Sequence, residues 1–318
     1  MKKLKKFWEI LKGAGAGFVE DNVFKLSASL SYYTVFALGP VLLIIISLAG
    51  LFYGRDDVQV SIYDQIKGLV GSDAAIQVQE IVSNVQQQDG GTFGAIVGGI
   101  VLVVSATVVF IEMQDSINRI WSVKAKPKKG WLKFLKNRLL SFSLIVGMGF
   151  ILLVSLIISA LLDMLSERLR RIFEDYTIYL FYVINVAVIF VVIAALFAVI
   201  FKILPDAEIK WKDSFVGASF TSVLFLIGKF GISFYLGQSE LGATYGAAAS
   251  IMVLFTWVYY SSLILYFGAE FTKSYAIHAG GGIRPSDTAV FVINREAREI
   301  DTNPTVEQQK TALKSAKE

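Results

Sequence analysis

The stretch Ile178-Tyr-Leu-Phe-Tyr-Val-Ile-Asn-Val-Ala-Val-Ile-Phe-Val-Val-Ile-Ala-Ala-Leu-Phe-Ala-Val-Ile-Phe-Lys-Ile-Leu204 decides the class of fold. Its residues from 178 to 201 include no charged side chain. A helix rises about 1.5 Å per residue, so about 20 apolar residues cross the hydrocarbon core of a bilayer. A soluble domain does not need so long an unbroken apolar run. This stretch therefore predicts a membrane-spanning helix.

The composition and the other apolar runs extend this prediction to most of the chain. Of 318 residues, 55% are hydrophobic and 18% are charged, and the mean hydropathy is +0.60. An average soluble domain has roughly 25% charged residues. Six long apolar runs occur, at roughly 27–53, 92–113, 138–163, 178–204, 213–236 and 245–272. The sequence thus predicts an all-α, polytopic membrane protein with a six-helix transmembrane domain over residues 27–275.

The distribution of Lys and Arg predicts the orientation of these helices. Cytoplasmic loops of membrane proteins carry an excess of basic residues. The N-terminal segment, the loops after the second and fourth spans, and the segment from Lys273 onward hold 24 basic residues, and the opposite side holds five. Both termini are therefore predicted to be cytoplasmic. The net charge of +4 and the pI near 9.0 follow from these loops, so nucleic acid is not expected as a partner.

Residues 1–26 are predicted to form an amphipathic interfacial segment. Leu4, Phe7, Trp8 and Leu11 recur at the spacing of one helix face, and lysines occupy the other face. A helix of this composition can lie on an anionic leaflet or can be an ordinary cytosolic helix. Its Trp and Lys content favours the interfacial interpretation.

Two other segments outside the spans have their own patterns. Residues 54–91 contain two short amphipathic stretches separated by Gly71-Ser72, which predicts a helical hairpin on the outer face. Residues 276–318 are polar apart from a short apolar run at Val290-Phe-Val-Ile293. Such a segment cannot build a core of its own. It is predicted to be a mobile cytoplasmic tail.

The sequence offers little for catalysis. It contains no cysteine, a single histidine (His278), no paired-His metal spacing and no phosphate-binding Gly-rich loop. Acid–base chemistry would have to rest on carboxylates alone. The acidic groups expected at membrane depth on the cytoplasmic side are Glu112, Asp115 and Glu270. We therefore expect no enzymatic activity, no metal and no cofactor.

Lys229 is the charged residue placed deepest within a predicted span. At the centre of a bilayer a lysine costs roughly 2.5–3.5 kcal/mol on insertion scales. Ser222 and Ser233 fall on the same helical stripe. Lys229 can line a pathway for an anionic substrate, or it can extend to the outer interface near Gln238 as a passive residue. The sequence does not separate these two interpretations.

Hydroxyl side chains and a proline mark the first predicted span. Ser27, Ser31 and Thr34 share one helix face, and Pro40 follows them. Proline within a helix frees a carbonyl group and bends the chain, and broken helices of this kind can line a cavity. A packed interface of small hydroxyl residues explains the same pattern and is the favoured interpretation.

The last predicted span carries a polar stripe that includes Thr256, Tyr259, Tyr266 and Glu270. Glu270 lies near the cytoplasmic boundary. A carboxylate at this depth either pairs with a cation, such as Arg119 or a loop lysine, or relays protons. Pairing is the favoured interpretation, because interfacial carboxylates usually find a cation nearby.

A set of short motifs, each weak alone, is specific in combination. They are Ala28-Ser-Leu-Ser-Tyr-Tyr-Thr-Val-Phe-Ala-Leu-Gly-Pro40, Asn118-Arg-Ile-Trp121, Leu204-Pro205 with Trp211, Tyr245-Gly246, Trp257-Val-Tyr259 and Gly268-Ala-Glu270. Over residues 10–277 the chain thereby resembles the YihY/BrkB family of bacterial inner-membrane proteins. The resemblance implies a six-helix protein of the bacterial inner membrane.

The same resemblance says little about biochemistry. Members have been called ribonuclease BN, a label regarded as misassigned, and virulence or serum-resistance factors. One branch is linked to lipid export across the inner membrane. The family has no established catalytic residues, so the resemblance assigns none to this chain.

The functional hypotheses follow from the intramembrane polar residues. The leading one is transport of an amphiphilic, lipid or anionic substrate, with Lys229, Pro40 and the polar stripes along its path. The alternative is a non-transporting scaffold or envelope-integrity factor, in which the same residues only pack. Ribonuclease activity at the basic loop 124–138 is not expected, and this loop is instead expected to contact anionic lipid head groups.

The predicted topology can be tested with reporter fusions. A fusion at residue 75 should report the outer side, and a fusion at the C-terminus should report the cytoplasm, because basic residues are concentrated in the segments predicted to be cytoplasmic. A C-terminal fusion that reports the outer side would overturn the predicted number of spans.

Overall fold

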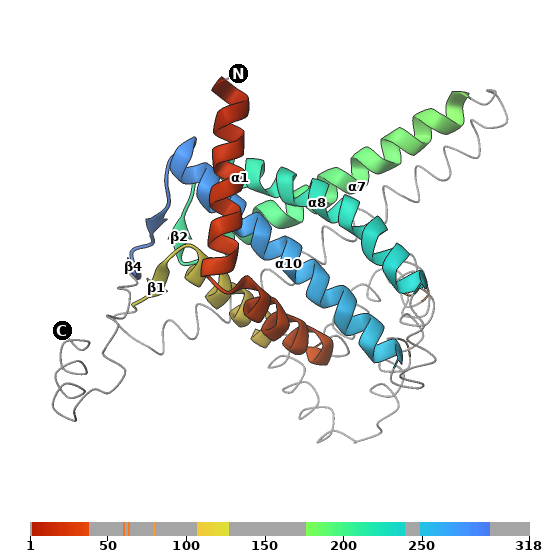
Figure 1. Cartoon of the computed structure of the whole chain (residues 1–318), viewed down its shortest axis with the longest axis horizontal. Helices are drawn as coiled ribbons and strands as arrows, with labels where there is room; N and C mark the ends of the chain where they lie inside the picture. Colours follow the sequence, from red (N-terminus) through yellow and green to blue (C-terminus); the bar gives the residue numbers. More distant parts are fainter. Residues whose placement is uncertain are drawn as a thin grey trace, which may run out of the picture.

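The computed structural model describes residues 2–37, 107–126, 176–238 and 249–292, together with residues 60, 63 and 79. Its helices are α1 (Lys2–Glu20), two helices over 23–37 and 107–120, α7 (Tyr176–Ile203), α8 (Trp211–Gln238) and α10 (Ala249–His278). Its strands are β1 (Val123–Ala125), β2 (Ala207–Glu208), β3 (Arg284–Pro285) and β4 (Ala289–Phe291). Figure 1 shows α8 lying between α7 and α10, with α1 crossing α10.

Three of the described helices are long and apolar enough to cross a membrane. The qualifying stretches are Val186–Ile203, Trp211–Ile232 and Met252–His278. They lie on α7, α8 and α10 and overlap the last three predicted spans. The all-α membrane class is therefore confirmed, whereas the count of six spans stays a prediction.

Several predicted features lie outside the described residues. The span 138–163 and Pro40 lie wholly outside them, as do most of the first two predicted spans and nearly all of the hairpin 54–91.

Close contact between α8 and α10 depends on two glycines that face two threonines. A Cβ atom on Gly217 would collide with Thr272, and one on Gly268 would collide with Thr221. Each threonine hydroxyl donates a hydrogen bond to the carbonyl four residues earlier, Thr221 to Gly217 at 2.7 Å and Thr272 to Gly268 at 2.6 Å. The small residues let the two backbones approach, and the internal hydrogen bonds satisfy the hydroxyl protons.

Helix α1 packs across the C-terminal part of α10. The Ser274 hydroxyl donates a hydrogen bond to the Ile10 carbonyl at 2.8 Å, and Ile10, Ala14 and Phe271 form a small buried cluster. At the start of α1, Leu4 is 78% exposed. Apolar side chains exposed on this helix suit an interfacial position, which stays a prediction.

Three motifs separated in the sequence meet at one end of the helices. The Asn118 amide donates a hydrogen bond to the Asp206 carboxylate at 2.9 Å, and the Asp206 backbone N–H donates to the Asn118 side-chain oxygen at 2.8 Å. The Trp121 indole N–H donates to the Ala269 carbonyl at 3.1 Å. Trp121 is 2% exposed and belongs to the main core together with Phe201. Helix 107–120, the α7–α8 connection and α10 are thus joined.

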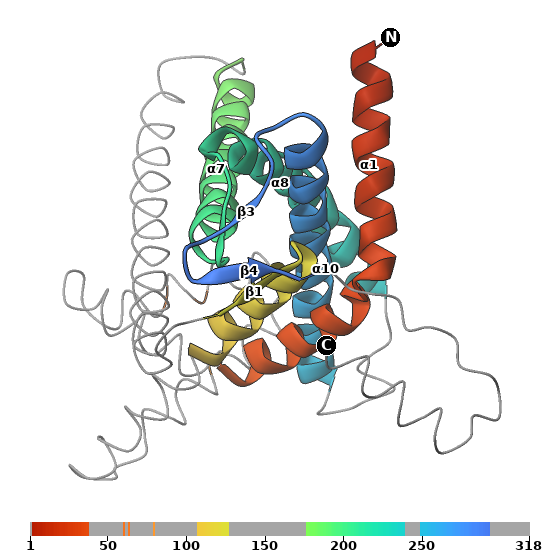
Figure 2. The same ribbon diagram turned by 90° about the vertical axis from the view of Figure 1, so that its left-hand side faces the viewer.

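Short antiparallel strands extend this junction. β1 pairs with β4, and β2 pairs with β3 (Figure 2). Backbone hydrogen bonds thus join residues 284–291 to two helix connections, and the short apolar run at the end of this segment supplies β4. The mobility expected for residues 276–318 stays a prediction.

Candidate functional site

The most deeply buried acidic group in the described part of the chain is Glu270, on α10. Its side chain is 1% exposed, and its Oε2 atom lies 3.6 Å from the Lys273 ammonium one turn later. The same ammonium lies 3.2 Å from the Asp21 carboxylate. Gly17 of α1 lies directly against the Glu270 carboxylate, because a Cβ atom there would collide with it. Two carboxylates thus share one ammonium where α1 meets α10.

The other oxygen of Glu270, Oε1, is fully buried, and no donor among the described residues reaches it. A buried polar atom without a partner costs free energy on the order of 1–3 kcal/mol, and more when it is charged. The cluster formed by Asp21, Glu270 and Lys273 is therefore incomplete as an ion-pair network.

Asp21 reaches this cluster because the chain turns sharply after α1. Asn22 has φ 56°, in the left-handed region that asparagine tolerates better than most residues. The Asn22 carbonyl then accepts hydrogen bonds from Lys25 and Leu26, which begin the next helix. Sequence reasoning missed Asp21, although Asp-Asn between two apolar helical patterns is a signal for such a turn.

A second buried polar group lies one helical turn before Glu270. Tyr266 is fully buried, and its hydroxyl lies beside Ser116 and within electrostatic range of Glu112, both on helix 107–120. Within the described part of the chain, this hydroxyl makes no hydrogen bond of standard geometry. Glu112 thus lies near α10 at Tyr266, and among the described residues no ion pair or hydrogen bond joins it to Glu270.

The cation beside Glu270 differs from the expected one. Lys273 of the same helix takes this place, rather than Arg119 or a loop lysine, and Arg119 is exposed. The physical reason is geometric, because residues three apart on a helix lie on the same face.

Of the other candidate residues, two hydrogen-bond to carbonyl groups of their own helices. The Ser31 hydroxyl donates to the Ala28 carbonyl, and the Thr256 hydroxyl donates to the Met252 carbonyl. Thr34 and Tyr259 are half-buried.

Lys229 lies on α8, apart from the charged cluster. It is half-buried, and its neighbour Phe230 is 71% exposed. Among the described residues no carboxylate lies within ion-pair distance of it. Within that part of the chain, nothing joins Lys229 to Glu270.

An apolar groove lies between α1, α8 and α10. Its volume is about 400 Å³. It is lined by Gly15, Phe18, Leu224, Ile227, Gly228, Tyr260, Leu263, Ile264 and Phe267. Gly15 faces open space, with no atom within 4 Å of the position a Cβ would take. The groove suits a flexible apolar chain, and sequence reasoning missed it because three separate helices form it.

The described residues contain no group of three or more His, Cys, Asp or Glu side chains able to hold a metal ion. The described structure thus contains an apolar groove, one side of which is formed by α1, and a buried charged cluster where α1 meets α10. These features define the class: an all-α, polytopic integral membrane protein whose candidate site lies between α1, α8 and α10.

The chain belongs to the Virulence factor BrkB family, whose family model matches residues 14–289. The resemblance stated from the sequence is thereby confirmed. The description of this family names no enzymatic activity.

Several relatives share this membership. A UPF0761 membrane protein of Saccharophagus degradans is 27% identical over 265 residues, covering 81% of this chain and 58% of the relative. A UPF0761 membrane protein of Xanthomonas campestris is 28% identical over 264 residues, with the same coverage. One from Vibrio vulnificus is 26% identical over 260 residues, covering 80% of this chain and 78% of the relative. The chain thus spans 58% of the length of the first two. No solved structure matches it.

Lys273 and Lys229 should respond differently to the same substitution. Lys273→Met leaves two carboxylates facing each other without a cation, so thermal stability should fall. The loss is expected to be on the order of 1–3 kcal/mol, below the ~3–5 kcal/mol of a fully buried pair because Lys273 is partly exposed. Lys229→Met removes a costly charge from an apolar helix and should leave thermal stability equal or higher.

Thermal unfolding of both variants in one detergent measures the difference, and each serves as the control for the other. A large loss of stability in Lys229→Met would show that this lysine pairs with a buried carboxylate.

Proposed function

We propose that this protein transports an amphiphilic, anionic lipid-like substrate, and that the groove between α1, α8 and α10 receives the acyl chain of this substrate. The observation that carries the proposal is the groove itself. This groove of about 400 Å³ lies beside an amphipathic helix and is lined by apolar side chains. Such a lining is complementary to a lipid tail and not to a polar metabolite.

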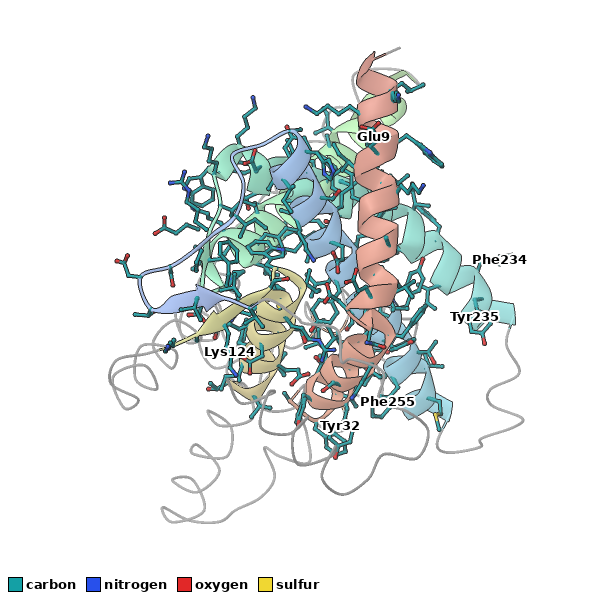
Figure 3. The ribbon with its side chains drawn as sticks, turned by 60° about the vertical axis from the view of Figure 1, so that its left-hand side comes forward. Glu9, Tyr32, Lys124, Phe234, Tyr235 and Phe255 are labelled. Carbon is teal, nitrogen blue, oxygen red and sulfur yellow. The ribbon has the colours of Figure 1, made fainter. Side chains whose placement is uncertain are left out.

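The position of the groove supports entry from the bilayer. Ile227, which lines it, is 64% exposed and begins a stripe that continues through Phe230 and Phe234, both more than 70% exposed. Phe234 and Tyr235 project outward from the end of α8 in Figure 3. A stripe of this kind faces lipid in a membrane-spanning helix. An acyl chain can thus pass from the bilayer into the groove without crossing water.

The lysines of α1 support the proposal that the substrate has an anionic head group. Lys12 is exposed and precedes Gly15 by three residues, so it lies on the same face of α1 one turn from the groove. Lys5 and Trp8 continue this face, and a Trp–Lys combination is typical of helices at an anionic interface. The head group would lie at the α1 lysines while the tail fills the groove.

The proposal includes an orientation. The strand pairs bring together the segments after helix 107–120, α7 and α10, and each lies in a part of the sequence rich in Lys and Arg. The positive-inside rule then assigns this end, together with α1, to the cytoplasm. In a bacterial inner membrane the groove would open to the cytoplasmic leaflet.

One observation favours the scaffold alternative. The reciprocal contacts of Gly217 with Thr272 and of Gly268 with Thr221 fix α8 against α10 with little freedom to slide. If α8 and α10 do not move relative to each other, a transporter needs another element that moves. In the described structure this element is α1.

Filling the groove tests the proposal. Gly15→Phe places a ring in open space within the groove, whereas Ala16→Phe adds the same ring on the exposed side of α1. In proteoliposomes, a phospholipid with a photoreactive acyl chain should cross-link to the native protein and to Ala16→Phe. Cross-linking and transbilayer movement of a fluorescent phospholipid should both fall several-fold in Gly15→Phe, because the ring occupies the place of the chain.

The two readouts separate the alternatives. Lipid that cross-links in the groove but crosses the bilayer no faster than in protein-free liposomes would support a scaffold. Equal cross-linking in both variants would show that the groove is not the lipid site.

A further inference from the structure

The cluster formed by Asp21, Glu270 and Lys273 has one negative charge more than it can compensate when both carboxyl groups are ionised. Glu270 is 1% exposed, and none of the residues that the structure describes donates to its Oε1 atom. Asp21 lies within hydrogen-bonding reach of the Glu270 carboxyl group, and its only described cation is also the cation of Glu270. Two ionised carboxylates that are close enough to share one ammonium repel each other strongly in an apolar surrounding.

A single proton removes this conflict. Protonated Glu270 is neutral and its hydroxyl can donate to the Asp21 carboxylate, so the orphaned oxygen gains a partner. Lys273 and Asp21 then form a one-to-one ion pair at 3.2 Å. A metal ion does not fit as well, because the Lys273 ammonium already lies 3.6 Å from Glu270 Oε2, where such an ion would have to bind.

We propose that Glu270 is a proton-binding site that controls the docking of α1 against α10. The proton exchanges with water through the mouth of the cluster, where the Lys273 side chain is 24% exposed and that of Asp21 is 12% exposed. On release, the proton passes to water and Glu270 becomes a carboxylate. The resulting repulsion acts between α10 and the end of α1.

The geometry connects this repulsion to the position of α1. Gly17 lies against the Glu270 carboxylate, and Gly15 and Phe18, on either side of Gly17, line the groove. Proton binding therefore favours a docked α1 and a formed groove, and proton release favours separation. The consequence for lipid rests on the proposed function, whereas the proton site does not depend on it.

The charged and titratable groups around Glu270 are few in the described structure. Asp21 comes from the turn after α1, and Lys273 comes from α10 itself. Tyr266 lies one turn earlier on α10 and faces Ser116 and Glu112 of helix 107–120. Tyr266 is neutral at ordinary pH, so the titration of the cluster is assigned to Glu270.

Infrared difference spectroscopy of the full chain in nanodiscs, recorded against pH, tests the proton site without any transported lipid. The native protein should show the carbonyl band of a protonated carboxylic acid, which disappears as the pH rises. Glu270→Gln should lose this band while remaining folded, because the amide has nearly the shape of the protonated acid. Asp21→Asn should weaken the band at the same pH, because Lys273 then pairs with Glu270 alone and the excess negative charge is gone. A band that persists in Glu270→Gln, or that is unchanged in Asp21→Asn, would overturn the proposal.

A distance measurement tests the coupling to α1. The chain contains no cysteine, so spin labels can be attached at Ala16→Cys on α1 and Ile277→Cys on α10, both exposed positions. Raising the pH should broaden and lengthen the distance distribution in the otherwise native protein. With Glu270→Gln added, the distribution should stay short at every pH. A pH-dependent distance that survives Glu270→Gln would refute control by this residue.

Discussion

A carboxyl group inside an apolar helix must be compensated by its neighbours, and the compensation of Glu270 fixes much of this structure. Lys273 supplies a cation from the same helix, and Asp21 is brought to the same cation by the turn after α1. Gly17 lets the α1 backbone approach the carboxylate. The position of α1 therefore depends on a polar contact, and the groove that α1 covers depends on it in turn.

The other described helices are joined to one another by close packing and hydrogen bonds, and α1 docks on them. α8 and α10 are held by the two glycine–threonine contacts, and the hydrogen bonds of Asn118 and Trp121 tie helix 107–120 to the α7–α8 connection and to α10. The motifs Asn118-Arg-Ile-Trp121, Leu204-Pro205 and Gly268-Ala-Glu270 lie together at this junction. In this chain each motif supplies residues to a shared set of hydrogen bonds and core contacts.

The sequence predicted the membrane class and the three long helices because the length of an apolar run is a local property. It also selected Glu270 as informative, because a carboxylate at membrane depth is costly wherever it lies. It did not predict that Asp21 would share the cation of Glu270, since that contact joins distant positions through an irregular turn. The groove was missed for the same reason, and the pairing of β4 with β1 was missed because a three-residue strand leaves almost no pattern.

The central claim is that α1 covers a lipid-binding groove on α8 and α10. A structure of the full chain determined in nanodiscs of anionic phospholipid tests it most directly. The account predicts elongated density in the groove beside Gly15, Phe18 and Ile264, with head-group density near Lys12. A structure in which α1 lies docked on α10 and the groove holds no lipid density would contradict it.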